Sequence, residues 1–351
     1  MEKKEVGKKT QKKRLTKKQR QKRKVIFTIV AILLMLVLLV LAFVAAKFGK
    51  LDRRKMDDVK VNDGLDTSSL DGYTSIALFG VDNRSNGDFD TGNSDTIIVA
   101  SINNKTGEIK MCSVYRDTYL DTDENAFEKA NAAYEKGGPE QAINMLNKNL
   151  DLNITDYVAV DFNALVEVID LLGGIEIDVT EEEVPFVNGY GEEITKVTGK
   201  TTTQIGAGTQ TLDGVQATAY ARIRATTGWD YKRTERQRLV INKMFEKAKG
   251  ASLTTLNSIM DKALPDVSTS LSNTELIGMM TQMSKYNMGD NTGFPFDKTS
   301  ERVGDLGIIT IPIDLAANVT QLHQFLYSNE TYAVSPTVQG ISDTIHENLG
   351  Y

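Results

Sequence analysis

The chain has 351 residues, of which 40% are hydrophobic and 25% charged, enough to build one large domain or two small ones. Its formal net charge is −6, and it contains two histidines and one cysteine. A single cysteine excludes an internal disulfide. So few histidines argue against a Ser-His-Asp or Cys-His mechanism and against a zinc site.

The two ends of the chain differ in charge. Residues 1–24 carry 13 Lys/Arg against two acidic residues, whereas residues 47–351 carry a net charge of −17. Between them, residues 25–46 form an uncharged apolar run of 22 residues, long enough for a helix to cross a hydrocarbon core. We predict a transmembrane anchor there, with a cleaved signal peptide as the alternative.

The basic segment 1–24 is then a cytoplasmic tail that sets the topology, and we favour this over a nucleic-acid-binding arm. The chain is predicted to be a single-pass type II protein of the cell membrane, with its domain outside the cell and no nucleic-acid partner. Residues 47–72 are charged and rich in turn formers, which predicts an extracellular stalk without a core element.

From Tyr73 the sequence changes to short apolar runs rich in β-branched residues, which predict three strands: TSIALFGV, TIIVASI and EIKMCSVY. The turn formers at 103–107 make the second and third strands an antiparallel hairpin. Residues 73–250 are predicted to be the catalytic core, and 251–351 the C-terminal part of the same extracellular domain.

Helical and extended patterns alternate further along. We expect helices at 124–148, 162–172, 212–221, 234–249 and 318–327, strands at 174–180 and 307–313, and a hairpin or excursion at 185–210. Asp213 and Gln216 form a capping-box pattern at the start of one helix. This mixture predicts an α/β fold, a three-layer α/β/α sandwich with a mixed central sheet.

Charged side chains mark the ends of the three predicted strands. The first ends at Asp82, the second begins near Asp95, and the third ends at Arg116 and Asp117. If the strands pair antiparallel, these residues and Arg84 meet at one edge of the sheet, where open α/β sheets bind ligands.

A second basic set follows, made of Arg222, Arg224, Arg233, Arg236 and Arg238. Arg233, Arg236 and Gln237 fall on one helix face by their spacing. Each arginine guanidinium can donate two parallel hydrogen bonds to phosphate oxygens, and ligation by oxygen atoms alone suits Mg²⁺. The charged residues at the strand ends and this second basic set together indicate a polyphosphate bridged by that cation.

Six motifs then appear in an order that resembles one family closely: ALFGVDNR, GNSDTIIVASIN, MCSVYRDTYL, KANAAYEKGG, LDGVQATAYARIR and DYKRTERQR. The chain resembles the LytR-CpsA-Psr family over about residues 75–250, with a looser match to LytR-like members in IPIDLAANVTQLHQFLY. The resemblance implies a type II membrane protein of Gram-positive bacteria with an α/β/α sandwich and an apolar groove for a polyprenyl tail. Such proteins transfer glycopolymers such as teichoic acid or capsule from a polyprenyl diphosphate carrier to peptidoglycan, with Mg²⁺.

Matched by motif, Asp82 and Asp95 look like metal ligands, and both are candidate catalytic residues with Arg116 and Arg222. The candidate diphosphate ligands are Arg84, Arg116, Arg222, Arg224, Arg233, Arg236 and Gln237. The stretch 183–209 is longer and richer in Gly and Thr than the family pattern. Either Asp82 or Asp95 could take the proton of the attacking hydroxyl. A non-catalytic lipid-binding regulator or scaffold and a polyprenyl diphosphate hydrolase are the alternative functions.

Overall fold

A computed structural model of the chain describes residues 35, 46–82, 89 and 92–350. The predicted tail 1–24, nearly all of the predicted span 25–46, and Arg84 lie outside these residues. In the part of the chain that is described, no helix is long and apolar enough to cross a membrane. The chain divides into two compact units, residues 1–49 and 50–351, and the fold below is that of the second unit.

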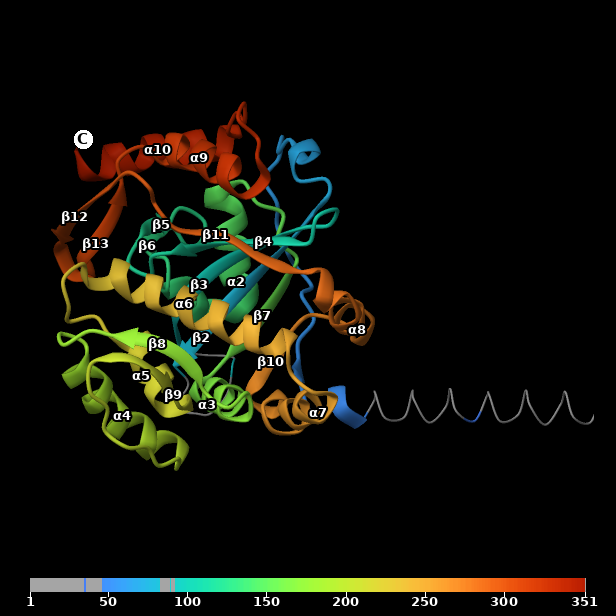
Figure 1. The fold of residues 1–351 in the computed structure, drawn as a ribbon. Coiled ribbons are helices and arrows are strands. Elements are labelled where there is room, and N and C mark those ends of the chain that lie inside the picture. The colour runs from blue at the N-terminus through green and yellow to red at the C-terminus, as the bar shows by residue number, and fades with distance from the viewer. Residues whose placement is uncertain (1–34, 36–45, 83–88, 90–91, 351) are drawn as a thin grey trace, which may run out of the picture. The chain divides into compact units, whose positions relative to one another are not determined.

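A seven-stranded mixed sheet forms the centre of the unit, in the order β1-β10-β7-β2-β3-β4-β11 (Figure 1). Its strands are β1 (Asp52–Arg53), β10 (Val267–Thr269), β7 (Asp156–Val160), β2 (Tyr73–Asp82), β3 (Asn93–Asn103), β4 (Glu108–Val114) and β11 (Asn287–Phe294). The three strands predicted first are β2, β3 and β4, and they pair antiparallel as expected. The predicted α/β class with a mixed central sheet is confirmed.

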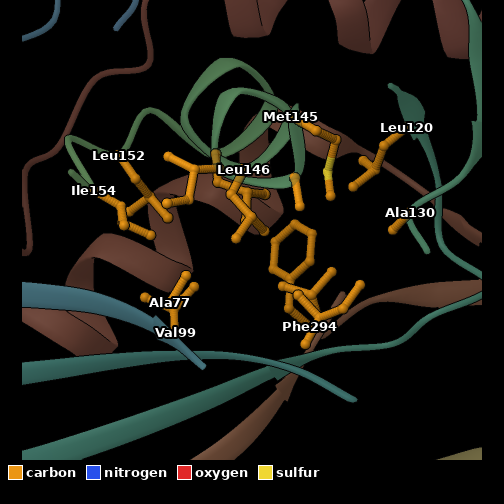
Figure 2. Packing of buried hydrophobic residues seen from close by; sticks show 14 of the residues in the cluster. Ala77, Val99, Leu120, Ala130, Met145, Leu146, Leu152, Ile154 and Phe294 are labelled. Carbon is orange, nitrogen blue, oxygen red and sulfur yellow. The ribbon is translucent and has the colours of Figure 1, made fainter. Parts of the chain in front are cut away.

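Alternation along the strands supplies an apolar surface on both faces of the sheet. Ala77 and Phe79 of β2 belong to one large cluster with α2 (Ala132–Leu150), α9 (Leu315–Tyr327) and α10 (Pro336–Leu349). Figure 2 shows Met145 and Leu146 of α2 over Ala77 and Val99 in this cluster. On the other face, Ile98 packs with α6 (Trp229–Lys249), and a further cluster includes α8 (Asn273–Gln282). Helices therefore cover both faces.

A second core is built mainly from the segment 162–223, which we call the α3–α5 lobe, and it also includes Val240 of α6. The lobe contains α3 (Phe162–Leu171), β8 (Ile175–Val179), α4 (Val184–Thr198), β9 (Gly208–Leu212) and α5 (Gly214–Arg222). The predicted capping box of α5 is present: Asp213 accepts from the Gln216 amide at 2.8 Å, and Gln216 accepts in return from the Asp213 amide at 2.9 Å. Gly214 is required because a side chain there would lie 2.3 Å from the Val166 carbonyl oxygen.

The stretch 185–210, expected as a hairpin or excursion, is mainly the helix α4, and only its last residues enter β9. Pro185 lies in the first turn, where its missing N–H costs nothing, and Gly199 ends the helix in the left-handed conformation at φ 70°. Val187, Gly191 and Ile194 are buried at helical spacing, so tertiary packing selects a helix despite the Gly/Thr-rich composition.

Other boundaries also differ from expectation. The helix expected from 124 begins at Ala132, because β6 (Phe127–Lys129) pairs with β5 (Tyr119–Asp121). α6 begins at Trp229, five residues before the expected start. The strand expected at 307–313 is β13 (Gly307–Pro312), which pairs with β12 (Lys298–Val303) outside the central sheet. α7 (Leu253–Lys262), α8 and α10 were not expected.

The segment 50–71, expected as a stalk without a core element, packs along α2. Leu70 is buried, and Met56 and Val59 pack against the large cluster. The Lys60 amide donates to the Asn144 side chain at 2.7 Å. This part of the stalk prediction is wrong: residues from Lys50 onward belong to the compact unit.

Candidate functional site

A β-bulge sets the position of Asp95. Gly80 pairs with Thr96 and Val81 with Ser94, so Asp95 is the extra residue of β3. Bulges redirect side chains, and they are common beside functional sites. Gly80 permits the close pairing, because a side chain there would lie 2.9 Å from the Thr96 side chain. Asp82, at the end of β2, lines the same cavity as Asp95.

Three arginines converge on Asp95. Arg116 donates to its Oδ1 at 2.6 Å, Arg224 to its Oδ2 at 3.1 Å, and Arg233 to its main-chain oxygen at 2.9 Å. Burial alone would raise the pKa of Asp95, but the three guanidinium groups together lower it below its ordinary value. Asp95 is therefore ionised at neutral pH and holds the arginines in place.

In the first turns of α6, the buried Arg233 forms an ion pair with the partly buried Asp230. Arg233 is 2% exposed and lies 2.9 Å from Asp230 Oδ1. Burial lowers the pKa of Arg233 to about 10, and burial raises the pKa of Asp230 against the opposing pull of the arginines. Asp230 also lies 3.8 Å from Arg224 Nε, so one carboxylate supports two arginines from the side of the helix.

Arg222 stands apart from this pair, at the C-terminus of α5. Its guanidinium lies 5.0 Å from the centre of the Phe162 ring and 5.1 Å from that of Tyr190. It also forms a 3.2 Å ion pair with Glu193, whose side chain is half exposed. Two of these partners come from α4, so the α3–α5 lobe positions this arginine.

These side chains surround a cavity of about 340 Å³, within the range of ligand pockets. Its lining combines the ionic group with an apolar group that includes Leu78, Ile98 and Ile241, which pack together in one cluster. Within the described residues, Arg233 Nε and Gln237 Oε1 are buried without a hydrogen-bond partner. Buried polar atoms of this kind are expected to meet a polar ligand or water.

Most of the predicted site residues meet in this cavity: Asp82, Asp95, Arg116, Arg222, Arg224, Arg233 and Gln237. Arg84 lies outside the described residues. Arg236 does not line the cavity; it is buried on another side of α6, where its Nε donates to Glu183 Oε1 at 2.7 Å and its Nη2 to Thr226 at 2.7 Å. Its guanidinium is thus occupied by structural partners.

The sequence placed Asp230 among the second basic set but assigned it no role, and it did not identify Phe162 or Tyr190 as part of the site. Asp230 and Arg233 are three residues apart on α6, a signal that becomes visible only when the helix starts at Trp229. Tyr190 could not be placed, because its segment was not expected to be helical.

The donor set fits a hard divalent cation that also binds phosphate. Among the residues that the structure covers, no group of three or more Asp, Glu, His or Cys could hold a metal by itself. Asp82 and Asp95 nevertheless line one cavity. Mg²⁺ is commonly bound by one or two carboxylates together with phosphate oxygens and water. The two carboxylates suit that arrangement.

Comparisons with known proteins agree with this architecture. A sequence model described as the LytR_cpsA_psr family matches residues 39–295. The polyisoprenyl-teichoic acid–peptidoglycan teichoic acid transferase TagU of Halalkalibacterium halodurans is 31% identical over 275 residues, 77% of this chain and 83% of TagU. The Bacillus subtilis transferase of the same description, TagV, is 29% identical over 74% of this chain and 61% of its own length. The crystal structure of B. subtilis TagV superposes with a TM-score of 0.57 and 26% identity, covering 75% of this chain and 98% of that chain.

Proposed function

Because the chain belongs to the LytR_cpsA_psr family, we propose that it is a phosphotransferase that attaches a polyprenyl-diphosphate-linked glycopolymer, such as a teichoic acid or capsule, to peptidoglycan. The observation that carries the proposal is one cavity lined by arginines, two carboxylates and an apolar group. A lipid diphosphate needs this combination, since it joins a highly charged centre to a hydrocarbon tail. The relatives named above are transferases of a polyisoprenyl-linked polymer, which supports the same substrate class.

The diphosphate is assigned to Arg116, Arg222, Arg224 and Arg233. Their guanidinium groups neutralise the charge that builds on the transferred phosphoryl oxygens. Because these donors are already in position, little free energy is spent on reorganising them during the reaction. Asp95 and Asp230 hold three of them in place before substrate arrives. The polyprenyl tail is assigned to the apolar part of the lining around Leu78, Ile98 and Ile241.

Asp82 and Asp95 would hold Mg²⁺, which would neutralise charge at the diphosphate. A hydroxyl oxygen of peptidoglycan attacks the phosphorus nearest the glycopolymer, and a new P–O bond forms. The bond from that phosphorus to the bridging oxygen breaks. Polyprenyl phosphate leaves with the electron pair, and a phosphodiester joins polymer and wall. Asp82 or Asp95 accepts the hydroxyl proton.

The reaction belongs outside the cell, because peptidoglycan lies there. The proposal therefore includes the membrane anchor at residues 25–46, with segment 1–24 in the cytoplasm and the domain outside. Protease added to intact, wall-stripped cells is expected to digest the domain. A protected domain would contradict this topology.

The direct test supplies the purified chain with a synthetic polyprenyl-diphosphate glycan, Mg²⁺ and peptidoglycan oligomers. We expect a glycan–peptidoglycan phosphodiester and polyprenyl phosphate in equal amounts, measured by mass spectrometry. Release of glycan phosphate at the same rate with and without acceptor would instead identify a hydrolase. Tight lipid binding without any product would identify a regulator or scaffold.

A further inference from the structure

Thr218 carries a hydroxyl group that the fold itself does not use. The residue lies in α5, is 1% exposed, and lines the cavity one helical turn before Arg222. Among the residues that the structure describes, its Oγ1 has no hydrogen-bond partner. An unpaired hydroxyl destabilises a protein when it is buried, so this atom calls for a partner from outside the chain.

Other helical threonines show which bond Thr218 lacks. Thr198, Thr320 and Thr344 each donate to the carbonyl oxygen four residues earlier, at 2.8, 3.2 and 2.8 Å. This bond is a common way for a helix to satisfy a threonine hydroxyl. Thr218 makes no such bond to Gly214. A threonine in a helix has two favoured χ1 rotamers, so the free hydroxyl can turn toward a ligand in the cavity.

The lining of the cavity changes from charged to apolar along both helices that carry it. Arg222 of α5 and Arg233 of α6 form the charged level. Thr218 and Gln237, each one turn further along its helix, are uncharged, and Gln237 Oε1 is also buried without a partner among the described residues. One more turn of α6 brings Ile241, which belongs to the apolar part of the lining. An uncharged polar level thus separates the arginines from the apolar part.

A polyprenyl-diphosphate-linked glycan has the same order of chemistry: a phosphate joined to the glycan, a second phosphate, and then hydrocarbon. With the tail in the apolar part, the second phosphate borders the tail and comes level with Thr218. We propose that the Thr218 hydroxyl donates a hydrogen bond to the phosphate that is joined to the polyprenyl chain. This phosphate leaves as polyprenyl phosphate, so the same contact holds the product. The assignment rests on the proposed function.

The test compares the binding of two lipids to the full chain in detergent, by calorimetry: a short synthetic polyprenyl diphosphate and the corresponding monophosphate. Thr218→Val keeps the shape of the side chain but removes the hydroxyl, and Thr218→Ser keeps the hydroxyl. The matched control is Ser101→Ala. Ser101 Oγ on β3 is likewise buried without a partner among the described residues, but Ser101 does not line the cavity.

We expect Thr218→Val to bind both lipids about tenfold or more weakly than the wild type, because a hydrogen bond to a charged phosphate is lost. Thr218→Ser and Ser101→Ala should bind both lipids like the wild type. Urea unfolding of the lipid-free Thr218→Val protein should show a midpoint no lower than that of the wild type, because no bond within the protein is removed.

Equal affinities of Thr218→Val and the wild type would overturn the assignment and leave the proposed function intact. A loss for the diphosphate alone would place the hydroxyl at the glycan-side phosphate and would also overturn it. A lower urea midpoint for lipid-free Thr218→Val would show a structural role instead. A wild type that binds neither lipid would overturn the proposed function together with this assignment.

Discussion

The burial of His323 predicts that the protein becomes less stable in acid. Its ring is fully buried in α9 and stacks on Tyr332 with centroids 3.6 Å apart. Its Nε2 donates to the Leu150 carbonyl at 3.0 Å, which requires only the neutral ring. Burial lowers the pKa of His323 from 6.5 to about 4.

Acid destabilises the protein through His323, because the folded and unfolded states bind different numbers of protons. Between pH 6.5 and about 4 the unfolded chain binds a proton at His323 and the folded chain does not, so acid favours unfolding. The stabilisation is complete above pH 6.5 and is lost as the pH falls toward 4. The whole difference corresponds to about 3 kcal/mol, of which about 2 kcal/mol falls between pH 7 and pH 4.5.

Urea unfolding at pH 7 and pH 4.5 measures this loss. His323→Gln keeps an N–H donor but cannot titrate, so its stability should fall about 2 kcal/mol less over this interval than that of the wild type. The sequence contains one other histidine, and His346→Gln is the matched control, since His346 is only partly buried. Equal pH slopes for His323→Gln and the wild type would refute the reasoning.

Three further predictions concern the site. Arg116→Lys keeps the charge but loses the planar guanidinium, so turnover in the transfer assay should fall about tenfold or more with lipid diphosphate still bound. The control Arg302→Lys, at an exposed position on β12, should match the wild type in the same assay. In the wild type, chelation should abolish transfer and added Mg²⁺ should restore it, whereas added Mg²⁺ should not restore transfer in Asp95→Asn. Full transfer by the wild type in chelator would refute the metal assignment. Gly80→Ala should lower the free energy of unfolding by about 1–3 kcal/mol through its contact with Thr96, and Thr96→Gly should relieve part of that loss in a double-mutant cycle; additive losses would contradict the steric cause.

The sequence predicted that the charged residues at the strand ends meet, because the pairing of two antiparallel strands fixes which residues lie opposite each other. In β3 and β4, Ile98 pairs with Ser113, so the same register carried past the end of β4 brings Arg116 opposite Asp95. The turn between the strands and their apolar alternation were enough to predict this pairing. The bulge could not be predicted, because it depends on the contact of Gly80 with Thr96.

Arg236 shows where helical spacing becomes ambiguous. At 3.6 residues per turn, Gln237 lies about 40° to one side of Arg233, and Arg236 about 60° to the other. By spacing alone, both share a face with Arg233. Only the positions of the partners decide between them: Gln237 reaches the cavity, and Arg236 reaches Glu183. Those partners come from the α3–α5 lobe and its link to α6, which the sequence did not place.

The segment 50–71 was misjudged for a different reason. Its apolar residues that pack on the core, such as the buried Leu70 and the partly buried Met56 and Val59, follow neither the helical nor the strand period. Their packing depends on the surface of α2, which is formed some 80 residues later in the chain, as the hydrogen bond from Lys60 to Asn144 shows. Periodicity reports regular elements, and an irregular segment that packs on another element escapes it.

The continuity of the α3–α5 lobe has a consequence for the order of folding. Its strands and helices come from one uninterrupted stretch, 162–223, so its contacts close short loops and form fast. The hydrogen bond from Arg233 to the main chain of Asp95 closes 138 residues, and it must wait for the central sheet. In native-state hydrogen exchange we expect the lobe to open as a cooperative unit of its own. On refolding, amide protection should then reach the lobe before the binding cavity is complete.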